Sequence, residues 1–167
     1  MKIIVCPAKA LLMNKDMQKE QPGNYAAIIC SSYTVDETQL FWLDKKLILM
    51  FDDTVNEFRA TCFSEAQAAL ASDFAMALDE GTTLYVCCDS GESRSAAIAA
   101  ALYRRFGLDE MLIWQNHRYH PNTLVYKRMC AALDMTVTED MIRERKQMND
   151  EALAAAIRAA RYGETEQ

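Results

Sequence analysis

The sequence predicts a single α/β domain of three layers, in which helices flank a short central sheet of mixed or parallel strands. Short runs rich in Ile, Val and Leu, each of strand length, lie within residues 2–87. Helical patterns dominate the second half, as in proteins that cover a sheet with helices. The 167 residues, 51% of them hydrophobic, suffice for one core, and no repeat or linker divides residues 1–167.

Four segments have the short, aliphatic character of buried strands. They are Lys2–Cys6, Ala26–Ser31, Lys46–Phe51 and Thr83–Cys87. Helical stretches lie between them and most predicted helices come late in the chain, which favours a sheet covered by helices.

Two helices are predicted around the last of these strands. The first opens at Ser64 with a capping box, Ser-Glu-Ala-Gln, and is expected to end near Gly81. The second, Ser95–Phe106, is apolar on nearly all faces and ends at Gly107, so it should be a central, buried helix.

Three further helices are predicted downstream. Asp109 can cap a short helix through Gln115, and Pro121 can begin another that runs to Leu133. The sequence Thr-Val-Thr-Glu at 136–139 caps a final polar helix over residues 136–162. This last helix is expected to pack either on its own domain or on a second copy of the chain.

Composition and charge exclude several classes of protein. A net charge of −6 argues against nonspecific nucleic-acid binding, which needs clustered Lys and Arg. No apolar run approaches the length that spans a membrane, and Lys2–Pro7 is too short for the core of a signal peptide. Six scattered cysteines indicate reduced thiols. We therefore expect a cytoplasmic protein that binds neither membrane nor nucleic acid.

The segment 88–95 carries the chemistry of the chain. It reads Cys-Asp-Ser-Gly-Glu-Ser-Arg-Ser and joins a predicted strand to a predicted helix with almost no slack. Such a loop turns backbone N–H groups toward one point, where the helix dipole adds positive potential. Cys88 would lie beneath a bound anion, and Arg94 could hold that anion with two parallel hydrogen bonds. Attack by sulfur on a phosphate ester requires this combination.

This segment resembles the loop of the cysteine-dependent protein tyrosine phosphatases, especially their dual-specificity branch. That loop reads His-Cys-x-x-Gly-x-Ser-Arg-Ser, and five positions match: Cys88, Gly91, Ser93, Arg94 and Ser95. Downstream, residues 118–122 (Arg-Tyr-His-Pro-Asn) resemble the start of a helix in the family. The resemblance covers about residues 47–134, and it departs from the family at Cys87, where His is usual, and at Ala96, where Pro is frequent.

The loop and the resemblance together imply a role for each residue. Cys88 is the expected nucleophile, because the amides, the helix dipole and Arg94 all favour its thiolate. Arg94 would grip the phosphoryl oxygens, and the Ser95 hydroxyl would donate to the Cys88 sulfur and assist its departure. The phosphate-binding loop is expected to comprise Asp89, Ser90, Gly91, Glu92, Ser93 and Arg94.

A general acid is expected on the acidic turn that follows the strand Lys46–Phe51. Asp52 and Asp53 both lie there, and Asp53-Thr54 resembles the Asp-Ser or Asp-Thr pair that the family places upstream of its nucleophile. We prefer Asp53 as the acid and keep Asp52 as the alternative. Both carboxylates could also simply solvate or cap the turn.

No cofactor or metal is expected. The two histidines, His117 and His120, lack further ligands at suitable spacing, so we place them on the surface or at the substrate rim. Cys87 should point to the opposite face of its strand from Cys88, into the core. A redox role for Cys87 is the less favoured alternative.

Phosphomonoester hydrolysis through a phosphocysteine intermediate is the function that the sequence favours, on a phosphorylated protein or a small phosphomonoester. Asp89 and Glu92 are expected at the pocket mouth, where they would disfavour polyphosphorylated substrates and oppose ionisation of Cys88. Asp89 could instead cap the amides of its own loop. Two other functions remain open: a catalytically weak module that binds phosphorylated partners, and a rhodanese-type sulfurtransferase.

Overall fold

In the computed structural model, which describes residues 1–13 and 23–163, four strands form one parallel sheet. The strands are β1 (Lys2–Pro7), β2 (Tyr25–Ser31), β3 (Lys45–Met50) and β4 (Thr83–Cys88), in the order β1-β4-β2-β3. Every strand lies within one residue of its predicted bounds. All three pairings are parallel, so of the two sheets predicted, mixed or parallel, the parallel one is correct.

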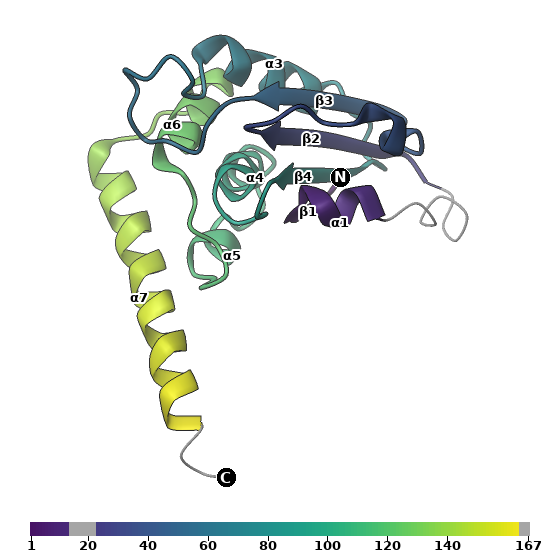
Figure 1. The fold of residues 1–167 in the computed structure, drawn as a ribbon. Helices are drawn as coiled ribbons and strands as arrows, with labels where there is room; N and C mark the ends of the chain where they lie inside the picture. Colours follow the sequence, from purple (N-terminus) through teal and green to yellow (C-terminus); the bar gives the residue numbers. More distant parts are fainter. Residues whose placement is uncertain (14–22, 164–167) are drawn as a thin grey trace.

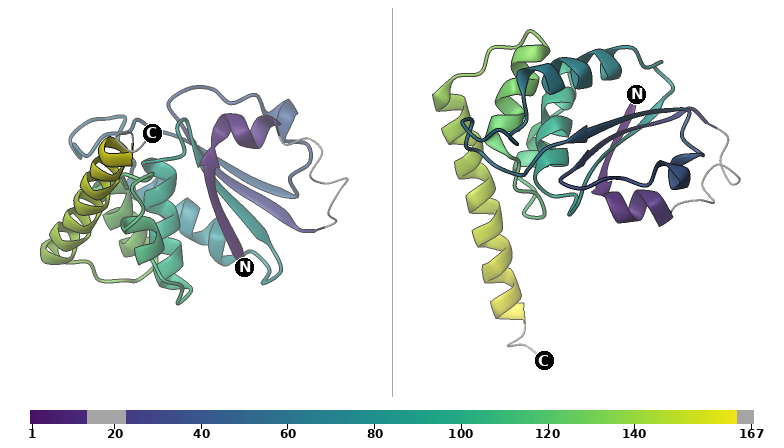
Figure 2. Two further views of the ribbon diagram at one scale, coloured as in Figure 1. Left: turned by 90° about the horizontal axis from the view of Figure 1, so that it is seen from below. Right: turned by 45° about the horizontal axis from the view of Figure 1, so that its top comes forward.

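Helices cover both faces of this sheet (Figures 1 and 2). In chain order they are α1 (Ala8–Met13), the 3₁₀ helix η1 (Glu37–Leu40), α3 (Glu65–Met76), α4 (Arg94–Arg105), α5 (Met111–Trp114), α6 (Thr123–Ala132) and α7 (Glu139–Gly163). Helices α1 and η1 were not predicted from the sequence, because both are shorter than the span over which a helical period can be recognised.

The core is divided by the sheet into two clusters. Leu84, Val86 and Cys88 of β4 face the larger cluster, which also contains the buried residues of α3, α4 and α6. Tyr85 and Cys87 face the smaller cluster, together with α1 and η1. Successive side chains of β4 thus point to opposite faces of the sheet, and both faces are covered by helices. This gives the three layers that were predicted. Cys88 therefore lies on the α4 side of the sheet and Cys87 on the other, as predicted.

Helix α3 begins as predicted but ends earlier. Its capping box is formed: the Ser64 hydroxyl accepts from the Gln67 N–H at 3.1 Å, and the Gln67 side chain accepts from the Ser64 N–H at 2.9 Å. The helix ends at Met76 and not near Gly81. A tight turn follows, in which the Thr82 N–H donates to the Asp79 carbonyl at 2.9 Å, because the chain must reverse to enter β4.

The last two helices also begin later than predicted. Asn122, not Pro121, caps α6 by accepting from the Val125 N–H at 3.1 Å. At the start of α7, the Thr138 hydroxyl accepts from the Met141 N–H at 3.2 Å. The capping residue is therefore Thr138 and not Thr136.

The first half of α7 packs on its own domain. Arg145 forms an ion pair with the buried Glu110 at 2.7 Å. The Asn149 amide donates to the carbonyls of Trp114 at 3.1 Å and Tyr119 at 2.7 Å. Beyond these contacts the helix extends away from the rest of the molecule (Figure 1).

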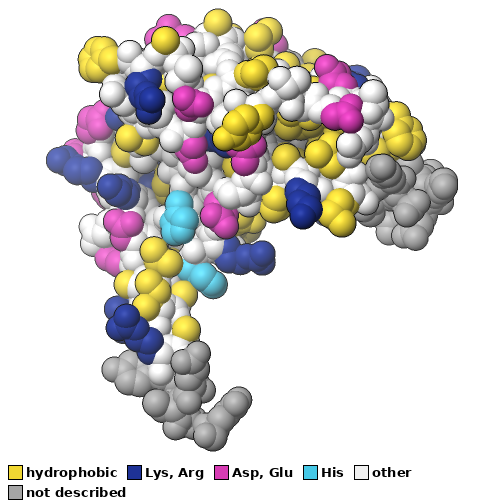
Figure 3. All heavy atoms as spheres, in the orientation of Figure 1, with side chains coloured by type: hydrophobic (Ala, Val, Ile, Leu, Met, Phe, Trp, Pro, Cys, Tyr) yellow, Lys and Arg dark blue, Asp and Glu magenta, His cyan; other side chains and the backbone are white. Residues whose placement is uncertain are grey.

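The surface mixes charges of both signs. On the face drawn in Figure 3, basic and acidic side chains of the described residues are interspersed and do not gather by sign. Among the helices of the described ranges, none has the length and hydrophobicity needed to cross a membrane.

Candidate active site

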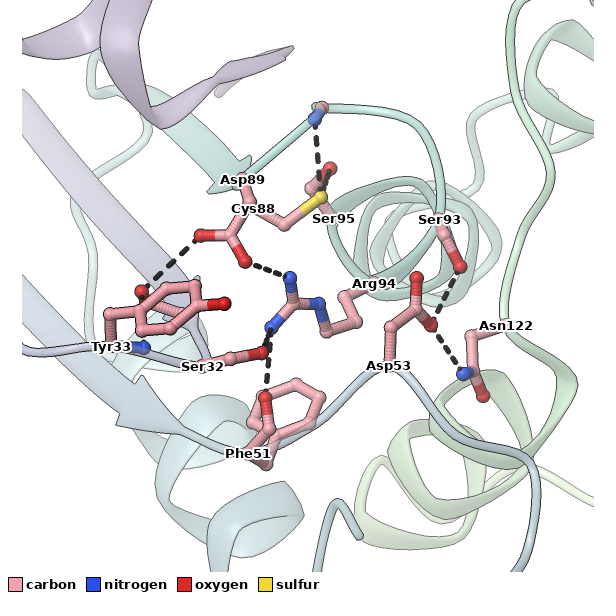
Figure 4. Close-up of polar contacts among 12 residues, drawn as sticks. Ser32, Tyr33, Phe51, Asp53, Cys88, Asp89, Ser93, Arg94, Ser95 and Asn122 are labelled. Carbon is pink, nitrogen blue, oxygen red and sulfur yellow. Dashed lines mark hydrogen bonds and ion pairs between the residues drawn. The ribbon is translucent and has the colours of Figure 1, made fainter. Parts of the chain in front are cut away.

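The loop between β4 and α4 is the centre of the candidate site (Figure 4). β4 ends at Cys88 and α4 begins at Arg94, so residues 89–93 make the whole connection. Gly91 has φ +76°, and a Cβ atom there would lie 2.4 Å from the Pro7 nitrogen and 2.6 Å from the Cys6 carbonyl carbon. Glycine is therefore required for both the left-handed conformation and the close approach of β1.

Cys88 is buried at the base of the loop, at 1% exposure. Its sulfur accepts from the Gly91 N–H at 3.2 Å and lies 3.1 Å from the Ser95 hydroxyl oxygen. Burial raises the pKa of the thiol, but hydrogen bonds from the Ser95 side chain and from the backbone of Ser95, Ser93 and Gly91 outweigh it. The net effect is a pKa of Cys88 below its ordinary value, which favours the nucleophilic thiolate.

Arg94 lies beside Cys88 with 4% of its surface exposed. Nη1 donates to the Phe51 carbonyl at 2.8 Å and to the Ser32 hydroxyl at 3.1 Å. The guanidinium also stacks on the Phe51 ring, 5.7 Å from its centroid. Among the described residues, the buried Nε has no hydrogen-bond partner. Sequence reasoning missed Ser32 and Phe51, because contacts from other strands leave no signal in the loop motif.

Asp89 forms an ion pair with Arg94, its Oδ2 accepting from Nη2 at 2.5 Å. Its Oδ1 accepts from the Ser31 hydroxyl at 3.3 Å. Burial lowers the pKa of Arg94, but the hydrogen bond and charge of Asp89 outweigh this and raise it. Asp89 is thus paired with Arg94, and its polar contacts are to the side chains of Arg94 and Ser31. Glu92 is exposed on the same loop.

The two candidate acids point to different partners. Asp53 Oδ1 accepts from the Ser93 hydroxyl at 2.9 Å and from the Asn122 amide at 2.7 Å, so it faces the loop. Asp52 accepts from the Thr61 hydroxyl at 2.7 Å and closes its own turn. The structure therefore brings Asp53 together with the loop and turns Asp52 away.

A cleft of about 540 Å³ adjoins the loop on the side of Asp53 and Ser93. Its lining also includes His120 and, from α7, Lys146. Asp53 and Ser93 line this cleft, whereas Cys88 and Arg94 do not. The His120 N–H donates to the Glu92 carbonyl at 2.9 Å and fixes this part of the lining against the loop.

Cys87 is fully buried on the opposite face of the sheet from Cys88. Its sulfur lies 3.2 Å from that of Cys6, its register partner on β1. In residues 1–13 and 23–163, no group of three or more His, Cys, Asp or Glu side chains is arranged to hold a metal ion.

Comparisons with protein-family models and with curated proteins find no match for this sequence. Solved structures of similar fold include PTPMT1 in complex with PI(5)P, at 14% identity and a TM-score of 0.46, covering 93% of this chain and 94% of that one. Human DUSP28 is 19% identical with a TM-score of 0.46, covering 92% and 94%. The Yvh1 phosphatase domain from Chaetomium thermophilum is 16% identical with a TM-score of 0.42, covering 89% and 90%. These likenesses concern the fold alone.

Proposed function

We propose that this protein hydrolyses phosphate monoesters by attack of the Cys88 sulfur on phosphorus. One observation carries the proposal: the Cys88 sulfur receives hydrogen bonds that lower its pKa, beside an arginine whose buried Nε is without a partner among the described residues. A thiolate next to a guanidinium with an unpaired N–H donor is the arrangement needed to bind and attack a phosphoryl group.

In the first step, the Cys88 thiolate forms a bond to phosphorus and the ester P–O bond breaks. Asp53 donates a proton to the departing oxygen. Its carboxylate lies beside the loop, where it accepts hydrogen bonds from the Ser93 hydroxyl and the Asn122 amide. Arg94 and the loop amides stabilise the charge on the remaining phosphoryl oxygens.

In the second step, water attacks the phosphocysteine and the S–P bond breaks. The Asp53 carboxylate accepts a proton from that water, which restores the acid for the next cycle. Ser95 supports this step, because its hydroxyl oxygen lies 3.1 Å from the Cys88 sulfur and can donate to the thiolate as it leaves. Inorganic phosphate is then released from the loop.

The substrate class is a phosphomonoester of low additional negative charge. The exposed Glu92 carboxylate on the loop opposes a second phosphate, whereas Asp89 contributes less repulsion because it is paired with Arg94. Exposed apolar and aromatic side chains near the loop suit an aryl leaving group. Val55 lies on the same turn as Asp53, and Tyr33 is linked to Asp89 through the Ser31 hydroxyl, which accepts from the Tyr33 N–H at 3.0 Å and donates to Asp89 (Figure 4). A phosphotyrosyl peptide of neutral or basic sequence fits this description.

The test is a pair of assays on the same preparation. The protein should release p-nitrophenolate from p-nitrophenyl phosphate, and it should form no thiocyanate from thiosulfate and cyanide. Cys88→Ser should abolish the release while still binding inorganic phosphate, and Arg94→Ala should lose both. Phosphate binding without turnover in the wild type would indicate a phospho-binding module. Thiocyanate formation without phosphatase activity would indicate a sulfurtransferase.

A further inference from the structure

The hydrogen-bond donors of Arg94 are unequally used. A guanidinium carries five N–H groups: two on Nη1, two on Nη2 and one on Nε. The contacts to Phe51 and Ser32 occupy Nη1, and Asp89 accepts from Nη2. The buried Nε has no partner among the described residues.

The free donors lie on one edge of the guanidinium. Nε and the neighbouring hydrogen of Nη2 form the side-on fork that grips two oxygens of a phosphoryl group. Figure 4 shows Cys88 and Ser95 on one side of the guanidinium, with Phe51 and Ser32 on the other and Asp89 flanking it. Phe51 and Ser32 therefore hold the Nη1 end, and Asp89 takes one hydrogen of Nη2, which leaves Nε–H and the second Nη2 hydrogen for the anion.

We propose that Asp89 is a positioning residue, which holds Arg94 so that its Nε–Nη2 edge faces the phosphoryl group above Cys88. This inference rests on the proposed function only in requiring that the loop binds a phosphoryl group. Asp89 is itself fixed, because Ser31 at the end of β2 donates to its second oxygen. A chain of contacts thus runs from β2 through Asp89 to Arg94.

If Asp89 only balanced the charge of Arg94, the direction of its hydrogen bond to Nη2 would not matter. The Asp89 side chain is 41% exposed and that of Arg94 only 5%, so water screens the Coulombic part of the pair while the hydrogen bond still fixes direction. An arginine side chain has many rotamers, and restricting it to one of them costs conformational entropy. When Asp89 orders the side chain before the anion binds, the binding free energy no longer includes this entropic cost. Asp89 should therefore strengthen anion binding although it carries a negative charge.

Glu92 provides a matched control. It lies on the same loop and bears the same charge, but its side chain has no hydrogen bond or ion pair to Arg94. Removing either carboxylate makes the loop less negative, which by charge alone favours an anion. If Asp89 positions Arg94, the two substitutions have opposite signs.

The experiment measures the Kd of inorganic phosphate by isothermal titration calorimetry. Asp89→Ala should weaken binding by about tenfold, as expected when a charge-assisted hydrogen bond to an ordered group is lost. Glu92→Ala, which removes a loop charge without touching Arg94, should tighten binding by up to about twofold. Asp89→Asn, which keeps one acceptor oxygen, should fall between wild type and Asp89→Ala, and it replaces Asp89→Ala if that variant does not fold.

The effect of Asp89→Ala is also measured in an Arg94→Lys background, because a purely structural role of Asp89 would give the same loss of phosphate binding with either side chain at position 94. Lysine has no fork to aim, so Asp89→Ala in this background should no longer weaken phosphate binding. Tighter binding in Asp89→Ala than in wild type would overturn the proposal, and so would an equal loss in both backgrounds. Wild type that binds no phosphate would overturn the proposed function as well, whereas binding that Asp89→Ala leaves intact would contradict this inference alone.

Discussion

The Ser95 hydroxyl is the one side-chain donor to the Cys88 sulfur within the described residues, so removing it is a clean perturbation of the nucleophile. Ser95→Ala leaves the backbone donors of Gly91 and Ser93 in place. A hydrogen bond to a charged group contributes about 1.5–3 kcal/mol, and one pH unit corresponds to about 1.4 kcal/mol. Since the backbone donors and water compensate in part, the pKa of Cys88 should rise by about one pH unit.

The sign of the pH effect follows from the thiolate. The pKa of Cys88 is lowered in the folded protein, so the reactive thiolate is present above that pKa and is lost as pH falls through it. In Ser95→Ala the acid limb of kcat/KM should therefore move to higher pH by about one unit. The second step should slow as well, because a more basic sulfur is a poorer leaving group.

The assay is the pH dependence of Cys88 alkylation by iodoacetamide, with the modified cysteine identified by mass spectrometry. Ser95→Thr, which keeps a hydroxyl at this position, is the matched control and should titrate near the wild type. An unchanged pKa of Cys88 in Ser95→Ala would refute the role assigned to this hydroxyl. That role is equally refuted if both variants raise the pKa by the same amount, since the hydroxyl would then not be its cause.

Three further predictions test the acid, the loop and the helical core. Asp53→Asn should slow turnover of alkyl phosphates by about 10²–10⁴-fold and that of p-nitrophenyl phosphate far less, whereas Asp52→Asn should be milder on both; a steeper leaving-group dependence for Asp52→Asn would reverse the assignment. Gly91→Ala should abolish turnover and lower the free energy of unfolding by about 1–3 kcal/mol. Gly107→Ala is the control: this glycine has φ +69° but lies in open space, so the substitution should lower the free energy of unfolding by about 1 kcal/mol without loss of turnover. Glu110→Ala should lower the free energy of unfolding in urea by about 2–4 kcal/mol, because it leaves Tyr126 and Arg145 without the carboxylate that accepts their hydrogen bonds. A decrease below about 1 kcal/mol would contradict this.

The sequence predicts the sheet well because its strands are local signals. Each is an aliphatic run between turns, so the bounds of β1 to β4 follow within one residue. The end of α3 and the start of α6 are less predictable. Ala77 and Leu78 are as suited to a helix as the residues before them, and only the reversal into β4 ends α3 at Met76.

The candidate site divides in the same way. Cys88, Gly91 and Arg94 belong to one short motif, and their geometry follows from a strand, a loop and a helix in sequence. The contact of Ser31 with Asp89 depends on where β2 ends, which nothing in residues 88–95 encodes. The packing of Gly91 against β1 likewise arises from the order of the strands.

The phosphocysteine itself is the most direct test of the proposed mechanism. Rapid mixing of the protein with p-nitrophenyl phosphate, followed by acid quench and mass spectrometry of peptides, should show one phosphoryl group on Cys88 within the first turnover. Ser95→Ala should accumulate more of this adduct, because its second step is slower. Turnover of the ester with no adduct on Cys88, or with the phosphoryl group on another residue, would contradict the account.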